Sequence, residues 1–390
     1  MSVNDLNFNQ LSTVLGEIVN QATGKAPAAP TNTNEFVTVA QTALKTGYDP
    51  LVTAISQVLS RSIFSNRPYY RKFKGLEADA IRYGNHVRKL NAVDKPFEED
   101  DRFKLVDGES IDQYKVNKPK VLQTNFYGYN VWQKSMTIYR DQLDNAFQSA
   151  DGFQSFLGMM MTNAQDMIEQ AHENTARATI ANLIGGTVAA NNNAPQVVHL
   201  VTEYKEFIGE TDPSFNVYDP ANFPMFARWL FGRIKTLSQS MEERSYIYHA
   251  NVTDNEIARH SPVREQRLYI YTPEINTIDA TVLSNTFNDE YLKLLPYEGV
   301  TFWQAISEPK KINVNCSYMD NTGAIVEGSF ESDKVLGVIH DREAAGYTVA
   351  NKWAQPTPFN ARGGYYNQYW HFTDRYWNDF SENAVVLLLD

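Results

Sequence analysis

The sequence predicts an α+β fold in which one long helix lies against strands from the second half of the chain. Three observations support this prediction: helical apolar spacing over 151–184, alternating short helical and strand patterns after residue 246, and strand-like runs at 365–377 and 384–389. The chain has 390 residues, of which 43% are hydrophobic, so it contains ample material for a core. A single compact core of this size is unusual, and we therefore expect two lobes or one elongated molecule.

The composition excludes several classes of protein. Cys316 is the one cysteine, so the chain forms no internal disulfide and no zinc site of paired cysteines. Residues 1–10 are polar and lack the pattern of a signal peptide, and no apolar run is long enough for a membrane span. We therefore expect synthesis in the cytoplasm and no membrane partner. The net charge of −11 argues against direct binding of nucleic acid, which depends on clustered Lys and Arg.

Residues 1–66 are predicted to form an N-terminal arm. Weak helical patterns at 11–19 and 51–59 flank the segment 22–34, which is rich in Ala, Pro, Thr and Asn. A segment of this composition buries too little apolar area to offset the entropy lost on ordering. We expect it to be mobile in an isolated chain and ordered only against a partner surface.

The segment 67–132 is predicted to be a long two-stranded hairpin. Residues 73–83 and 117–131 have the aromatic and β-branched content of strands, and a long charged stretch joins them. A compact domain rarely contains so long a connection without a function. It is either a large surface hairpin or an arm that reaches another chain.

Positive charge gathers at the start of this segment. Between Arg67 and Lys89 the acidic residues are Glu77 and Asp79, and an acidic cluster follows at 98–101. Three interpretations stay open: a solvated face, a nucleic-acid patch, or a surface that meets an oppositely charged neighbour. The candidate residues for contact between chains are Arg71, Lys72, Lys74, Arg82, Arg88 and Lys89.

The clearest element is a helix at 151–184, roughly 50 Å long at 1.5 Å per residue. Asp151 can cap its start, and Gly185 and Gly186 mark its end. We expect it to be continuous and to pack across a sheet that contains 384–389. Because Met167 lies on its apolar side, we expect Met167→Asp to abolish folding. The apolar positions are Phe153, Phe156, Leu157, Met160, Ala164, Met167, Ile168, Ala171 and Ala178.

The remaining elements alternate between helix and strand. Pro224 is well placed in the first turn of a helix over 223–241. A further helix begins at Thr272, and the aromatic run 365–377 indicates a strand pair or one long strand. Residues 384–389 are apolar in succession, which is typical of a strand buried on both faces. The other expected strands are 268–271, 300–306 and 335–340.

No pattern in the sequence indicates catalysis. The chain lacks the Gly-Lys-Ser/Thr phosphate loop, the Gly-x-Ser-x-Gly elbow and the His-Glu-x-x-His zinc motif. His340 and Asp341 are adjacent on a predicted strand and therefore point to opposite faces, which prevents a direct acid–base pair. Cys316 has no histidine near it in the sequence. We predict no catalytic, cofactor-binding or metal-binding residues, and no enzymatic activity.

The order of these elements resembles the capsid fold of tailed bacteriophages, the Hong Kong 97-like fold. Several stretches resemble capsid proteins of the short-tailed phi-29 group. Phe73-Lys74-Gly75 with 81–83 resembles the start of their E-loop, and 272–288 resembles an axial-domain helix. The stretch 361–367, followed by 383–386, resembles their C-terminal strands.

The resemblance implies a division of the chain into named parts. The long helix 151–184 would be the spine helix of the peripheral domain. The expected parts are an N-arm at 1–66, an E-loop at 67–132, a peripheral domain at 133–245, an axial domain at 246–335, and C-terminal strands at 336–390 that return to the peripheral domain.

The same resemblance implies a major capsid protein of the virion. It would self-assemble into hexamers and pentamers of an icosahedral shell around double-stranded DNA, without sequence-specific binding and without a cofactor. Scaffolding, portal and decoration proteins are further expected partners. The alternatives are an encapsulin-like nanocompartment shell and, from a different class, a cytosolic enzyme of unrecognised family.

Overall fold

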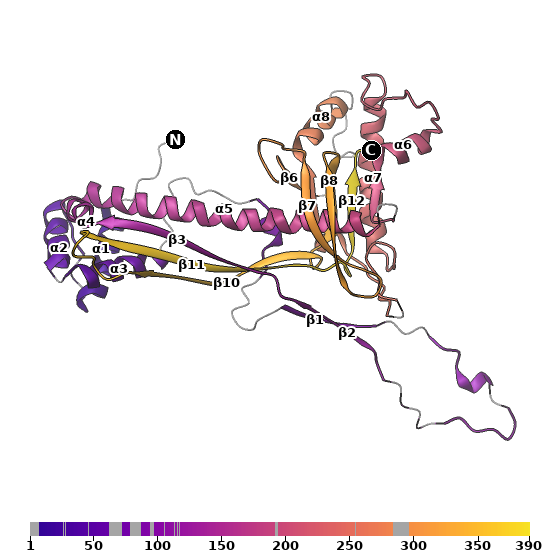
Figure 1. Cartoon of the computed structure of the whole chain (residues 1–390), viewed down its shortest axis with the longest axis horizontal. Coiled ribbons are helices and arrows are strands. Elements are labelled where there is room, and N and C mark those ends of the chain that lie inside the picture. Colours follow the sequence, from indigo (N-terminus) through magenta and orange to yellow (C-terminus); the bar gives the residue numbers. More distant parts are fainter. Residues whose placement is uncertain are drawn as a thin grey trace.

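The long helix organises the arrangement of the whole chain. The structure is a computed structural model, and it describes residues 8–390 except 26, 28, 46, 62–71, 79–86, 94–96, 105, 113, 115, 117, 192–193, 254 and 284–295. Helix α5 (Ala150–Ala190) is continuous over 41 residues, or roughly 60 Å. Figure 1 shows short helices at one end of it, a lobe of helices and strands at the other, and a hairpin that projects away from the body. The molecule is therefore elongated, which is one of the two shapes that the chain length predicted.

A long antiparallel sheet runs beside α5. Its strands follow the order β10 (Ala345–Pro356), β11 (Tyr365–Asn378), β3 (Tyr129–Tyr139). Alternate residues of β11 are buried, which is the pattern of a strand with one covered face. On that face Asp374 lies 3.0 Å from Nδ1 of His172 in α5, and both side chains are buried. The aromatic run 365–377 is therefore one long strand.

The N-terminal region folds against its own chain. Helices α1 (Phe8–Thr23), α2 (Thr33–Lys45) and α3 (Tyr48–Arg61) pack on the start of α5, next to α4 (Arg140–Ala146). Phe36 is fully buried, with its ring 5.7 Å from that of Phe153. The sequence predicted an arm over 1–66 with helical patterns at 11–19 and 51–59. The structure adds the helix α2 between them, whose pattern was missed, so that helices flank the stretch 24–32.

The second lobe is built on a five-stranded sheet. Its order is β4 (Val197–His199), β12 (Ala384–Leu388), β9 (Val335–Asp341), β5 (Gln266–Tyr271), β6 (Glu298–Val300). Val386 and Leu388 of β12 pack with the end of α5, whereas Val385 and Leu387 pack with α7 (Phe223–Glu242). The predictions of a helix at 223–241, of a doubly buried last strand, and of α5 packed on that strand are confirmed. Helices α6 (Leu200–Ile208) and α8 (Thr272–Leu283) complete the lobe.

The ends of α5 differ from the predicted ones. Ser149 caps the helix, because its Oγ accepts from the backbone N–H of Gly152 at 3.0 Å. The helix continues past Gly185 and Gly186, which allow a hairpin to approach closely. A Cβ on Gly185 would lie 2.6 Å from Val314 of the hairpin β7 (Ile312–Met319) and β8 (Ile325–Ser332). The two glycines therefore serve packing and not termination.

Three further predictions need correction. Residues 74–76 form the 3₁₀ turn η1 (Lys74–Leu76) and not a strand, and 79–83 lie outside the described residues. The predicted strand 300–306 ends at Val300. Met167 is 46% exposed, so it does not belong to the core of the single chain. Of the helices that the structure describes, none combines the length and apolar character of a membrane span.

Candidate interaction surface on the projecting hairpin

The projecting hairpin, here called the extension, comprises residues 87–126. Strands β1 (Val87–Ala92) and β2 (Val121–Phe126) pair antiparallel, with Val87 opposite Phe126 and Ala92 opposite Val121. The long connection between them includes the short turn η2 (Asp101–Lys104). Figure 1 shows the extension pointing away from both lobes. The predicted strand 117–131 is thus two strands, because the chain leaves β2 and enters β3 next to Gly128, where a Cβ would lie 2.6 Å from the carbonyl oxygen of Tyr376.

Large apolar side chains are exposed along the extension. Phe97 is fully exposed, and the exposed fractions of Phe103 and Tyr114 are 82% and 81%. A folded chain rarely leaves several such side chains together in water unless they bind a partner. The sequence signal that could have revealed this surface is the presence of Phe97, Phe103 and Tyr114 within a charged connection. The other exposed apolar residues here are Leu90, Val106, Ile111, Val116 and Val121.

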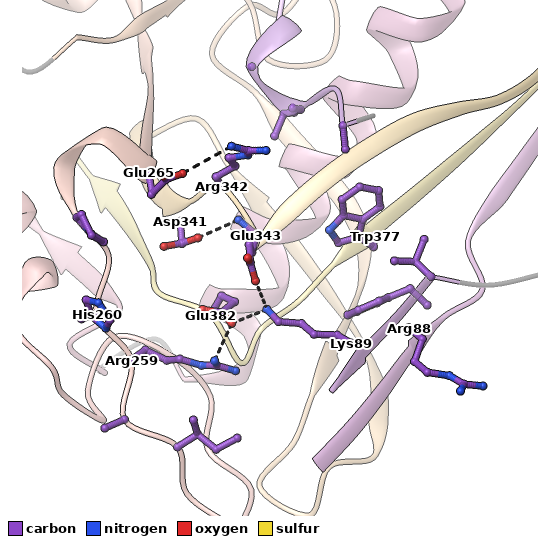
Figure 2. A pocket seen from close by; sticks show the side chains of 18 of the residues that line it. Arg88, Lys89, Arg259, His260, Glu265, Asp341, Arg342, Glu343, Trp377 and Glu382 are labelled. Carbon is purple, nitrogen blue, oxygen red and sulfur yellow. Dashed lines mark hydrogen bonds and ion pairs between the residues drawn. The ribbon is translucent and has the colours of Figure 1, made fainter. Parts of the chain in front are cut away.

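Lys89 anchors the base of the extension to the body of the same chain. Its Nζ lies 2.8 Å from Oε2 of Glu343 and 3.0 Å from Oδ2 of Asp379, and it also donates to Glu382. Figure 2 shows Lys89 reaching toward Glu382 and Glu343, whereas the neighbouring Arg88 points away from them. This alternation follows from the strand period of two.

Arg259 completes the cluster from a second direction. Its Nη1 lies 3.0 Å from Oε1 of Glu382, its Nε donates to the carbonyl oxygen of Ser381 at 2.9 Å, and Nη1 also reaches Oδ1 of Asn91 at 3.3 Å. Burial opposes the charge of Lys89, but Asp379 and Glu382 outweigh this effect, so the pKa of Lys89 lies above its ordinary value. Burial raises the pKa of Glu382, and the two cations partly offset that rise.

A hollow of about 1030 Å³ lies beside this cluster. Phe126, Ile257 and Trp377 contribute apolar lining, and Arg88 and Arg244 contribute charge. Among the residues that the structure describes, no group of three or more His, Cys, Asp or Glu is placed to hold a metal ion. The mixed lining does not indicate one class of small ligand.

Four of the six candidate contact residues lie in the described part of the chain, and their surroundings differ. Lys72 and Lys74 have exposed side chains near η1, Arg88 is exposed on the outer face of β1, and Lys89 points inward. Arg71 and Arg82 lie outside the described residues. The structure therefore gives Lys89 partners within its own chain.

Phe73 secures the chain where it approaches the extension. It is fully buried, its ring centroid lies 4.9 Å from that of Tyr269, and the guanidinium of Arg177 lies 5.1 Å from its ring. Its φ of 61° is in the left-handed region, which is costly for a bulky side chain. Its backbone N–H donates to Glu298, and that of Lys72 donates to Glu173 at 3.1 Å. Packing and two carboxylates therefore hold a strained backbone in place.

The two residues considered for catalysis, His340 and Cys316, are both buried. His340 is fully buried, and its Nδ1 lies 2.7 Å from the backbone oxygen of Asp341, not from the carboxylate. Burial lowers the pKa of His340 to about 4. Cys316 is buried, and burial raises the pKa of its thiol. A buried thiol of raised pKa is a poor nucleophile.

Comparison with solved structures shows the same architecture in phage capsids. The capsid structure of Staphylococcus phage Andhra is 12% identical and has a TM-score of 0.53, covering 84% of this chain and 87% of that chain. A chain in the structure of the head fiber and inner core protein of native bacteriophage P68 has the same identity and coverage, with a TM-score of 0.51. At this identity the likeness shows the fold alone, and it confirms the predicted α+β capsid fold.

Comparison of sequences identifies the family. No curated protein matches the chain significantly in sequence. The family model of the Phi29-like phage major capsid protein matches residues 15–388, which is nearly the whole chain. The chain therefore belongs to the Phi29-like phage major capsid protein family.

Proposed function

We propose that the extension is the arm by which each copy of this capsid protein binds its neighbour, in hexamers and pentamers of an icosahedral shell. As a major capsid protein the chain is a structural subunit of the virion capsid and not an enzyme. The observation that carries the proposal is the set of exposed apolar residues on the extension, led by Phe97, Phe103 and Tyr114. Aromatic residues are enriched at the buried centres of protein interfaces. A neighbouring copy would cover them.

The parts of the fold fit the named parts of a capsid subunit. We assign the extension to the E-loop, α5 with the sheet β10-β11-β3 to the peripheral domain, and the five-stranded sheet with α6, α7 and α8 to the axial domain. The N-arm would correspond to the helices α1 to α3, and β9 to β12 would be shared between the two lobes. This division differs from the sequence-based one in two places: it moves β4, α6 and α7 from the peripheral to the axial domain, and it divides 336–390 between the two.

The shell would enclose double-stranded DNA without gripping it. A net charge of −11 disfavours tight phosphate binding, so packaged DNA could slide along the wall. Scaffolding, portal and decoration proteins stay proposed partners. The family match favours a phage shell over the encapsulin-like nanocompartment and the unrecognised enzyme.

We propose that the basic residues near η1 and on the outer face of β1 meet acidic surface on the next subunit. Lys72, Lys74 and Arg88 are exposed, which leaves their side chains accessible to a neighbour. Arg71 and Arg82 stay part of this prediction. Lys89 was included in it on the basis of the sequence, but its ion pairs with Glu343, Asp379 and Glu382 favour a role within the subunit.

The apolar contacts are tested by the triple variant Phe97→Ser, Phe103→Ser and Tyr114→Ser. Burial of a large apolar side chain contributes roughly 1.5–3 kcal/mol, so each interface would lose about 5 kcal/mol or more. We expect folded subunits with an unchanged melting temperature and at least tenfold fewer closed particles by electron microscopy. The matched control, Asp107→Ser with Glu109→Ser in the same exposed connection, should assemble normally. Normal assembly of the triple variant would refute the apolar contact.

The basic contacts are tested by the double variant Lys72→Glu and Lys74→Glu, and by the triple variant that adds Arg71→Glu. Both described side chains are exposed, so the subunit should fold. Exposed pairs contribute at most about 1 kcal/mol each, but a shell repeats every contact, so particle yield should fall and the loss should depend on salt. The control is Arg228→Glu with Lys235→Glu on the exposed side of α7. Equal yields from variant and control at every ionic strength would indicate a solvated face.

A further inference from the structure

We infer that Lys89 is a positioning residue, which sets the direction in which the extension leaves the body. Its side chain is 18% exposed and is surrounded by the carboxylates of Asp379, Glu382 and Glu343. Within β1, Lys89 and Asn91 are on the inner face, and Asn91 reaches the body through Arg259. The inference takes the extension to be an arm toward another subunit, as proposed above, and assigns to Lys89 the separate task of aiming it.

One acceptor of Lys89, the carboxylate of Asp379, is itself held in a fixed position. Oδ1 of Asp379 accepts from the backbone N–H of Ser381 at 3.0 Å and from its hydroxyl at 2.6 Å. The backbone N–H of Asp379 donates to Ala344 at 2.7 Å, and that of Glu382 donates to Asp379 at 3.2 Å. These bonds build a tight turn in which the carboxylate of Asp379 cannot follow the lysine if β1 moves. A displaced extension would therefore lose the ion pair between Lys89 and Asp379.

The turn that holds Asp379 and Glu382 lies where it can fix the direction of the extension relative to the body. It joins β11, which lies in the long sheet beside α5, to β12, which lies in the five-stranded sheet. Lys89 thus ties the extension to the junction of the two lobes. The other strand of the extension is fixed independently, because Gly128 between β2 and β3 accepts from the backbone N–H of Tyr376 at 3.2 Å. Two fixed strands define one direction, whereas one fixed strand defines a hinge.

The charge balance makes the position of Lys89 specific. The side chains of Asp379 and Glu382 are 2% and 8% exposed, so each needs a cation close by. Among the described residues, Arg259 forms an ion pair with Glu382, whereas Asp379 pairs with Lys89. Without Lys89, the carboxylate of Asp379 would lose its cation beside a second buried carboxylate. This arrangement favours the one geometry in which the ammonium reaches the turn.

The direction of the extension can be measured on single subunits, without assembly. Spin labels on Val121→Cys, at the far end of β2, and on Asn174→Cys, on the exposed side of α5, report the distance from extension to body. Cys316 is buried, so labelling is confined to the two introduced cysteines. Pulsed electron paramagnetic resonance of dissociated full-length subunits would give the distance distribution for Lys89→Met, for Lys89→Arg and for the control Arg88→Met.

We expect one narrow distribution for the parent, for Arg88→Met and for Lys89→Arg, and a distribution at least twice as wide for Lys89→Met. An unchanged width in Lys89→Met would overturn the inference, because backbone contacts would then suffice. If Lys89→Met does not fold, Glu343→Gln removes one partner whose side chain is 67% exposed. It should broaden the distribution less but detectably, and an unchanged width there would overturn the inference as well. Because no particle is formed, failure of this test is distinct from failure of the proposed interface.

Discussion

Replacing Ile184 with Asp is expected to prevent the chain from folding. Ile184 of α5 is fully buried. It belongs to the core that α5 shares with Val386 and Leu388 of β12. The change removes roughly 1.5–3 kcal/mol of apolar burial and places an unpaired carboxylate in that core, which costs several kcal/mol more. Their sum approaches the 5–15 kcal/mol that typically stabilises a whole domain. The yield of folded subunits and the circular dichroism spectrum measure the effect.

The matched control is Met167→Asp in the same helix. Met167 is 46% exposed in the single chain, so the new carboxylate would stay in water and the subunit should fold. This reverses the expectation from the apolar spacing alone, which placed Met167 in the core. If Met167→Asp prevents folding and Ile184→Asp allows it, the assignment of the buried and exposed faces of α5 is wrong.

Gly337→Ala is expected to destabilise the five-stranded sheet by roughly 3 kcal/mol, at the upper end of the range for overpacking a core. Gly337 lies in β9 between β12 and β5, opposite Leu387 on one side and Ile270 on the other. An added Cβ would lie 2.5 Å from the carbonyl oxygen of Tyr269 and 3.2 Å from Cα of Ile270. These are backbone atoms of a central strand, so they cannot move aside as a flexible side chain could. The midpoint of denaturant unfolding measures the loss.

Gly232→Ala is the control for the glycine substitution. Gly232 lies on an exposed part of α7, and an added Cβ would meet no atom within 4 Å. Replacing an unconstrained helical glycine with Ala should stabilise the protein by about 0.5–1 kcal/mol. Opposite signs for the two variants are the expected result. Equal destabilisation would mean that the close backbone approach at Gly337 is not the cause.

The predictions that held depend on patterns within one element. The apolar spacing of 151–184 and 223–241 marks one side of each helix, and both helices were found as α5 and α7. The unbroken apolar run at 384–389 requires cover on two faces, and β12 has α5 on one side and α7 on the other. The absence of a catalytic motif agreed with membership of a structural family.

The predictions that failed depend on what a segment packs against. Gly185 and Gly186 look like a helix end, because glycine is frequent there, but the hairpin β7–β8 needs the space they leave. Residues 1–66 were predicted to be an arm because the stretch 22–34 is rich in Ala, Pro, Thr and Asn, and the helix α2 that follows this stretch was missed. Phe36 of α2 is nevertheless buried, since Phe153 and Phe147, far along the chain, complete its surroundings.

The charged residues divide in the same way. The sequence showed an excess of Lys and Arg over 67–89 within an acidic chain, but it did not predict the strand β1, whose period of two places Arg88 and Lys89 on opposite faces. Which face meets the body was decided by the turn that holds Asp379 and Glu382, 290 to 293 residues away from Lys89 in sequence. By itself the sequence determined the long helix, the buried final strand and the capsid family resemblance, because local spacing and order encode them. Only the tertiary structure decided that Lys89 is held within its own subunit, because an ion pair depends on distances in space that no local pattern records.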